Sequence, residues 1–98
     1  MIIVKANVVT KEGMRNDFVK AAAQCVLETR KEPGCISYEF LVSTEDDCAG
    51  AFIEQWQKME DLSEHSKKEH YKKFKKDSRD VVAQPTVVKI FEATEKAL

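Results

Sequence analysis

The side chains best suited to chemistry in this 98-residue chain gather in one stretch, EQWQKMEDLSEHSKKEHYKKF, at residues 54–74. It holds the only tryptophan, Trp56, and both histidines, His65 and His70. Histidine titrates near neutral pH without help from its surroundings, so it is the natural candidate for a general base. A tryptophan beside such a base could hold a flat aromatic ring. The competing interpretation is structural, because a strand end that leads into a lysine-rich helix would also bring these residues together.

Metal binding is not predicted from this stretch. His65 and His70 are five residues apart, whereas side chains on one face of a regular helix are three or four apart. The cysteines are odd in number and have no C-x-x-C spacing, which argues against a disulfide framework or a zinc site. We expect Cys25, Cys35 and Cys48 to be reduced and to serve mainly in packing.

Changes in hydrophobic period divide the chain into six main elements. A β-branched run at 2–9 predicts a strand, and apolar residues at helical spacing from Met14 to Thr29 predict a helix that KEPG ends. CISYEFLV at 35–42 alternates with period two, with Ile36 and Tyr38 on one side, and 51–57 follows as its hairpin partner. A short helix or turn from Met59, a longer helix from residue 69, and a last strand within QPTVVKIFEA complete the chain.

This order predicts one α+β domain over residues 1–98, with a ferredoxin-like βαββαβ fold and both helices on one face of a four-stranded antiparallel sheet. The first and last predicted strands are apolar on both sides. The bare face should therefore also be covered, and a second copy of the chain would cover it, giving a homodimer in which two sheets form an α/β barrel. A helix end or the C-terminal tail is the alternative cover.

Composition excludes several classes of protein. The chain is 43% hydrophobic and 34% charged with a net charge of -1, which excludes a disordered chain and gives no overall attraction for nucleic acid or membranes. The lysines between 67 and 76 are spaced as a solvated helix face, which argues further against nucleic-acid binding. The apolar N-terminus is too short for a signal peptide, and no run approaches 18 apolar residues, so we expect a cytoplasmic protein.

Three motifs, EPGCISYEF, FIEQW and EHSKKEHYKKF, together resemble the antibiotic biosynthesis monooxygenase domain family. The family pattern runs E-x-G-(C/N)-x-x-(Y/F), then a strand that ends E-x-W or E-x-Y, then a helix with H-x-x-x-x-H-(Y/F). The likeness covers nearly the whole chain. It implies a ferredoxin-like subunit in a dimeric α/β barrel, with a pocket between sheet and helices. Family members include monooxygenases that oxidise quinols or polyketide anthrones with O2 and without metal or flavin.

Oxygenation without a cofactor requires a base, aromatic walls and a donor for a developing oxyanion. The resemblance makes His65 the predicted base, Trp56 and Tyr38 aromatic walls, and Asn7 a polar positioning group, with His65, Trp56 and Asn7 as the catalytic set. The further substrate-binding residues would be Phe52, His70, Tyr71 and Phe74. Asn7 also has a plainer interpretation, as a solvent-facing residue on the same side as Lys5.

Two details limit this assignment. Phe52 stands where some anthrone-oxidising relatives carry a polar residue, which weakens that substrate class, and we expect no arginine on the helix near the pocket. Glu54 matches the strand glutamate of the family, and a structural hydrogen bond or a salt bridge would explain it without catalysis.

Three other functions stay open at the level of sequence. Related proteins isomerise a phosphorylated quorum-sensing sugar, and others degrade haem, which would then be bound. A small-ligand-binding or stress-response dimer without turnover would use the same pocket. The leading prediction is a monooxygenase with O2 as co-substrate and no cofactor, acting on a quinol-like or polycyclic phenolic molecule.

Overall fold

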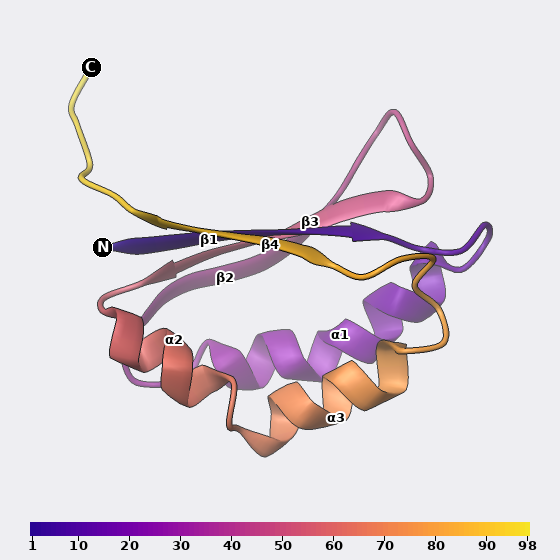
Figure 1. Ribbon diagram of the computed structural model, residues 1–98, viewed down its shortest axis with the longest axis horizontal. Helices are drawn as coiled ribbons and strands as arrows, with labels where there is room; N and C mark the ends of the chain where they lie inside the picture. The colour runs from indigo at the N-terminus through magenta and orange to yellow at the C-terminus, as the bar shows by residue number, and fades with distance from the viewer.

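The computed structural model describes residues 1–98 and confirms the predicted order of elements. Figure 1 shows one layer of sheet and one layer of helices. The strands are β1 (Ile2–Val9), β2 (Cys35–Val42), β3 (Ala49–Trp56) and β4 (Val87–Glu92); the helices are α1 (Arg15–Thr29), α2 (Met59–His65) and α3 (Glu69–Ser78). No helix of the protein is long and apolar enough to cross a lipid bilayer.

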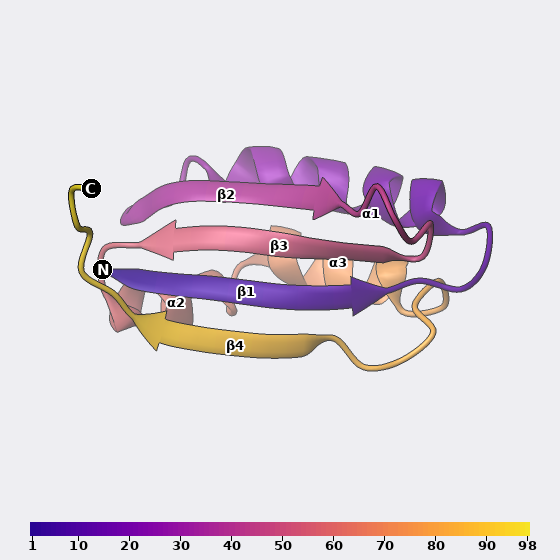
Figure 2. The same cartoon turned by 90° about the horizontal axis from the view of Figure 1, so that it is seen from above.

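The four strands form one antiparallel sheet in the order β2-β3-β1-β4 (Figure 2). All three helices lie on the same face, so the other face is uncovered in the single chain (Figure 1). This is the ferredoxin-like βαββαβ arrangement, with α2 as an additional short helix before α3. We call the covered side the helix face and the other side the open face.

Alternation along β1 decides which side chains enter the core. Ile2, Val4, Ala6 and Val8 are buried on the helix face, and the residues between them point to the open face. α1 presents the matching stripe, because Phe18, Ala22, Cys25 and Thr29 are its buried residues. The predicted helical spacing from Met14 to Thr29 is thus the spacing that packs on the sheet.

The alternation predicted for β2 is wrong at its start, because a β-bulge shifts the register between Cys35 and Ser37. Cys35 packs against the core, whereas Ile36 is 49% exposed. From Tyr38 onward the prediction is correct, since Tyr38 is buried on the helix face and pairs with Glu54 of β3. A period-two pattern cannot reveal an extra residue in one strand, so this shift could not be predicted from side-chain spacing.

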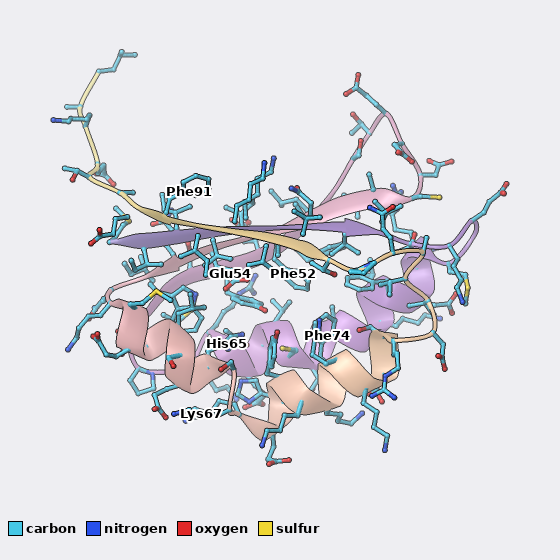
Figure 3. The ribbon with its side chains drawn as sticks, viewed as in Figure 1. Phe52, Glu54, His65, Lys67, Phe74 and Phe91 are labelled. Carbon is cyan, nitrogen blue, oxygen red and sulfur yellow. The ribbon has the colours of Figure 1, made fainter.

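β4 differs from the other strands because all of its residues are exposed. It is an edge strand that pairs only with β1, and even its residues on the helix face, Val88 and Ile90, are exposed. Its Phe91 lies on the open face with its β1 partner Ile3 (Figure 3). Both sides of this strand are apolar, as predicted, yet neither is buried within one chain.

Candidate active site

His65 lies at the end of α2 and is held by a carboxylate from a distant part of the chain. Its Nδ1 is 2.7 Å from Oε2 of Glu32, and both side chains are almost fully buried. Because a carboxylate accepts hydrogen bonds, this contact places the proton of a neutral imidazole on Nδ1. The other ring nitrogen, Nε2, is then the basic one, and it is buried without a hydrogen-bond partner in the protein.

The turn between α1 and β2 positions Glu32. The backbone N–H of Cys35 donates to the carbonyl of Glu32, and Pro33 and Gly34 occupy the two central positions. Gly34 has φ of +82°, which suits the type II turn that this residue pair favours. A Cβ on Gly34 would lie 2.1 Å from Oδ2 of Asp61 in α2. The absence of a side chain therefore lets α2, with His65 at its end, pack closely on the turn that carries Glu32.

His70, at the start of α3, also contacts Glu32, with Nε2 at 2.7 Å from the same Oε2. Ser66 to Lys68 separate α2 from α3, so the two histidines do not lie on one regular helix. The spacing argument against a metal site was therefore based on a wrong assumption. Glu32, His65 and His70 place one ligand atom each within 4.8 Å, which could hold a metal ion. However, two N–H groups on one carboxylate oxygen satisfy this cluster without an ion.

Aromatic rings surround the His65 imidazole. Ring centroids lie 5.0 Å away for Trp56, 5.3 Å for Tyr38 and 4.9 Å for Tyr71. This environment takes the imidazole out of water, and burial lowers the pKa of His65 although the hydrogen bond and the charge of Glu32 act in the opposite direction. His65 is therefore neutral at neutral pH, which is the form that a general base requires.

Glu54 is a second titratable group on the helix face. It is 6% exposed, and its Oε1 accepts a hydrogen bond of 3.0 Å from Nε1 of Trp56. Burial raises its pKa to about 7, the bond from Trp56 lowers it, and the charge of Glu32 raises it further. Burial likewise raises the pKa of Tyr38 and of Tyr71, so both phenols keep their protons.

A cavity of about 540 Å³ lies between the sheet and the helices α2 and α3. His65 and Glu54 both border it, from opposite layers (Figure 3). Twelve of its 21 lining residues are hydrophobic, and the predicted substrate-binding residues Tyr38, Phe52, Tyr71 and Phe74 are among the lining side chains. The volume and the apolar wall are those of a small-molecule site.

The cavity opens beside β4. Val88 and Ile90 line it, yet they are 56% and 47% exposed. The last turn of α3 and the residue after it add Lys75 and Arg79 to the lining. No arginine lies on α3 itself, but Arg79 follows this helix directly and does line the cavity, a position that could not be fixed from the sequence without knowing where the helix ends.

Asn7 requires a correction. Its side chain lies on the open face, because Val4, Ala6 and Val8 face the helices and Asn7 alternates with them. Its cross-strand partners are Ala51 and Val87, and it does not line the cavity. Asn7 and His65 are therefore on opposite sides of the sheet, and the plainer interpretation, in which Asn7 shares a face with Lys5, is the one that the fold supports.

Trp56 and His70 also lie elsewhere than predicted. Trp56 is 0% exposed and does not form a wall of the cavity; it lies behind His65 and binds Glu54. His70 is absent from the cavity wall as well and contacts Glu32 instead. Glu32 was not predicted as a site residue, although it is the first letter of the quoted E-x-G motif. An acidic residue directly before a Pro-Gly pair, within a motif shared with the family, is the sequence signal that could have found it.

Comparison with known proteins agrees with this architecture. The family model described as antibiotic biosynthesis monooxygenase matches residues 1–77, which include β1 to β3, both histidines and nearly all of α3. The chain belongs to this family. An uncharacterised protein of Synechocystis sp. is 30% identical over 94 residues, or 96% of this chain. The chain spans 64% of the length of that curated relative.

Several solved structures superimpose closely on the chain. A protein from Nitrosomonas europaea gives a TM-score of 0.93 at 20% identity, covering 97% of this chain and 100% of that one. A conserved protein from Methanosarcina mazei has a TM-score of 0.90 at 24% identity, and the match covers 95% of this chain and 92% of that one. A structure described as an antibiotic biosynthesis monooxygenase has a TM-score of 0.89 at 25% identity, and the match covers 97% of this chain and 100% of that one. At identities of 20% and 24%, the first two show a shared fold.

Proposed function

We propose that this member of the antibiotic biosynthesis monooxygenase family oxidises a quinol-like or polycyclic phenolic molecule with O2 and without a cofactor, using His65 as the base. The observation that carries the proposal is the pairing of His65 with Glu32 at the edge of an apolar cavity. Glu32 fixes the tautomer of the imidazole, so that Nε2 is free to take a proton from a substrate hydroxyl. Nε2 is buried in the free protein, so neighbouring side chains must shift slightly when a substrate binds.

The first step would create a phenolate, which is far more electron-rich than the phenol and can transfer an electron to O2. The apolar cavity helps by keeping out water that would compete for the anion. Tyr38 and Phe52 on the sheet and Tyr71 and Phe74 on α3 line the cavity, and the rings of Phe52 and Phe74 touch with centroids 5.5 Å apart, so these side chains form one aromatic wall on which a flat ring could stack. Lys75 and Arg79 would attract a substrate that carries negative charge.

The direct test is O2 uptake by metal-stripped protein with a panel of hydroquinones, naphthols and anthrones. A general base contributes about 10²–10⁴-fold, so we expect His65→Gln to lower kcat/KM at least about 100-fold, or ~2.7 kcal/mol of transition-state stabilisation. Glu32→Gln leaves Nε2 in place and only weakens its orientation, so a smaller loss is expected. Wild-type protein that consumes no O2 with any panel member, or an equally active His65→Gln, would contradict the proposal.

Isomerisation of a phosphorylated sugar is a second candidate, favoured by Lys75 and Arg79 at a cavity that also holds His65 and Glu54. These cations could bind a phosphate, and the two titratable groups could move a proton between neighbouring carbons. The mostly apolar wall suits an aromatic ring better than a sugar. Inorganic phosphate separates the two: it would compete with a phosphorylated sugar, whereas it would leave the oxidation of an uncharged quinol unchanged.

We also propose that the open face pairs with the open face of a second copy. Large apolar residues remain exposed on this side of the sheet, among them Leu41, Val87 and Phe91. Exposed apolar patches of this kind usually mark an interface. Because His65 and Glu54 are on the helix face, such a dimer would leave each cavity with its own complete set of groups.

A further inference from the structure

The cavity contains a carboxyl group that the proposed base does not use. Glu54 comes from the middle of the sheet, where its cross-strand neighbours are Tyr38 and Val4. It lies on the helix side of the sheet, across the cavity from His65 (Figure 3). No cation pairs with it, and its one protein hydrogen bond comes from Trp56. A carboxyl group in such a place needs an explanation beyond packing, because burying it without a charge partner is costly.

Trp56 fixes the position of both groups. Its Nε1 donates to Oε1 of Glu54, while its ring packs 5.0 Å from the ring of His65. Since Trp56 is 0% exposed, it cannot move out of this position without disturbing the core. Oε2 of Glu54 has no protein partner. Glu54 is therefore held by one oxygen and can exchange a proton through the other.

We infer that Glu54 is the general acid that protonates the hydroxide released when the O–O bond of a substrate hydroperoxide breaks. This inference rests on the proposed function. In the first half of the reaction, His65 takes a proton from the substrate and returns it to the peroxide formed by addition of O2, which gives R2CH–OOH. In the second half, His65 takes the proton from that carbon, a C=O bond forms, the O–O bond breaks, and Glu54 gives its proton to the leaving hydroxide.

Atoms and electrons balance in this scheme. The substrate carbon changes from CH2 to C=O and loses four electrons, and O2 gains four, with one oxygen atom in the product and one in water. The imidazolium then returns its proton to the Glu54 carboxylate, which restores the enzyme. The substrate class follows: a phenol whose oxidised ring position carries hydrogen, so that its keto tautomer has a CH2 group.

The surroundings of Glu54 favour the protonated acid before the reaction. Its raised pKa of about 7 agrees with this role, because part of the population is protonated at neutral pH. The titratable groups around Glu54 come from all the elements packed on this part of the sheet. They are Cys25 from α1, Glu32 from the turn before β2, Tyr38 from β2, His65 from α2 and Tyr71 from α3. The fixed cations of the cavity wall are Lys75 and Arg79, and neither of them lowers the pKa of Glu54, which only the hydrogen bond from Trp56 lowers.

Infrared difference spectroscopy tests the protonation state without any substrate. Wild type minus Glu54→Gln at pH 6 should show a carboxylic-acid C=O stretch that disappears when the pH is raised to 8.5. The Gln side chain keeps the acceptor for Trp56 and nearly the same volume, so the fold should not change. A spectrum without this band would show an ionised Glu54 and would overturn the inference.

Kinetics test the role itself. In Glu54→Gln we expect kcat to fall about 100-fold with KM within about twofold, the hydroperoxide to accumulate, and initial O2 consumption in a single turnover to persist. Formic acid should partly restore turnover in Glu54→Ala. The matched control is Glu12→Gln, because Glu12 is exposed in the turn between β1 and α1, away from both the cavity and the open face.

The outcomes separate the two proposals. A wild type that takes up no O2 contradicts the proposed function and the acid role with it. An active wild type whose kcat is unchanged in Glu54→Gln overturns only the role of Glu54. A Glu54→Gln variant that loses activity without accumulating hydroperoxide, and whose Ala counterpart does not respond to formic acid, also overturns it, because that pattern is what a structural residue would give.

Discussion

The helix face and the open face of the sheet are made by the same strands and differ by one residue in register. On the helix face, β3 contributes Phe52, Glu54 and Trp56, all buried and all beside or behind the cavity. On the open face, the same strand contributes Ala51 and Ile53, which are only partly buried. One face thus surrounds polar groups with apolar walls, and the other has apolar side chains without cover. Alternation alone therefore separates the side chains around the cavity from the uncovered apolar side chains in a domain this small.

The largest effect should come from closing the space that Gly34 leaves for α2. Gly34→Ala places a Cβ against the Asp61 carboxylate and also forces a non-glycine residue into positive φ. We expect a loss of about 3 kcal/mol in the free energy of unfolding, measured by urea denaturation, and a fall in activity as His65 moves away from Glu32.

Gly13→Ala is the matched control for this variant. Gly13 also has positive φ, at +76°, but a Cβ there would meet no atom within 4 Å. It should show only the cost of the backbone conformation, about 1 kcal/mol, with full activity. Equal losses in the two variants would mean that the close approach of α2 does not matter.

Phe91→Glu tests whether the open face forms the proposed dimer interface. Phe91 is 50% exposed in the single chain, and a charge at this position would be buried in the proposed dimer. We expect sedimentation to show a dissociation constant at least about 30-fold higher, or ~2 kcal/mol, with little change in the stability of the subunit. Leu27→Glu, an exposed position on α1, should leave the dimer intact. A monomeric wild type would reject the interface.

A smaller effect should appear in the pH dependence of stability. The native pKa of Glu54 is about 7, against 4.5 for an ordinary glutamate, so the native state holds this proton to higher pH than the unfolded state does. The relative stability of wild type over Glu54→Gln should therefore be greatest below about pH 4.5. It should fall as the pH rises from about 4.5 to about 7, the window between the unfolded and the native pKa of Glu54, and level off above that. Urea unfolding at pH 4.5, 6 and 8 measures it, and a constant difference would show that the pKa of Glu54 is ordinary.

The smallest effect is expected at Asn7. Because Asn7 lies on the open face, Asn7→Ala should change kcat/KM less than twofold. The measurement is the O2-uptake assay in which His65→Gln is expected to lose about 100-fold. A tenfold loss would restore Asn7 to the catalytic set and would contradict the separation of the two faces.

The sequence was sufficient to predict the strands and helices in which apolar side chains recur at a regular spacing. β1 at residues 2–9 and the buried stripe of α1 follow from side-chain spacing alone, and so does the neighbouring position of β1 and β3 once the topology is set. The family motifs correctly directed attention to His65, which does border the cavity. Its function as a base stays a prediction.

The remainder depends on contacts that spacing cannot show. Glu32 and His65 are 33 residues apart, and only the packing of α2 on the turn before β2 brings them together. Asn7 was assigned to the catalytic set partly because it is polar within an apolar strand. Polarity does not say, however, which face of a sheet is covered by helices. Trp56 was predicted as a wall because tryptophan is large and aromatic, but complete burial makes it a support for its neighbours instead.

The exposed edge at β4 has a consequence for how such a protein could change over evolutionary time. Val88 and Ile90 border the open end of the cavity on β4, which β1 separates from the strand that carries Glu54, and neither contributes a titratable group. Substitutions there would alter the size and shape of the molecules admitted while leaving the proposed proton-transfer groups, His65 and Glu54, in place. If these groups act as proposed, single mutations at this rim could admit new substrates without passing through inactive forms.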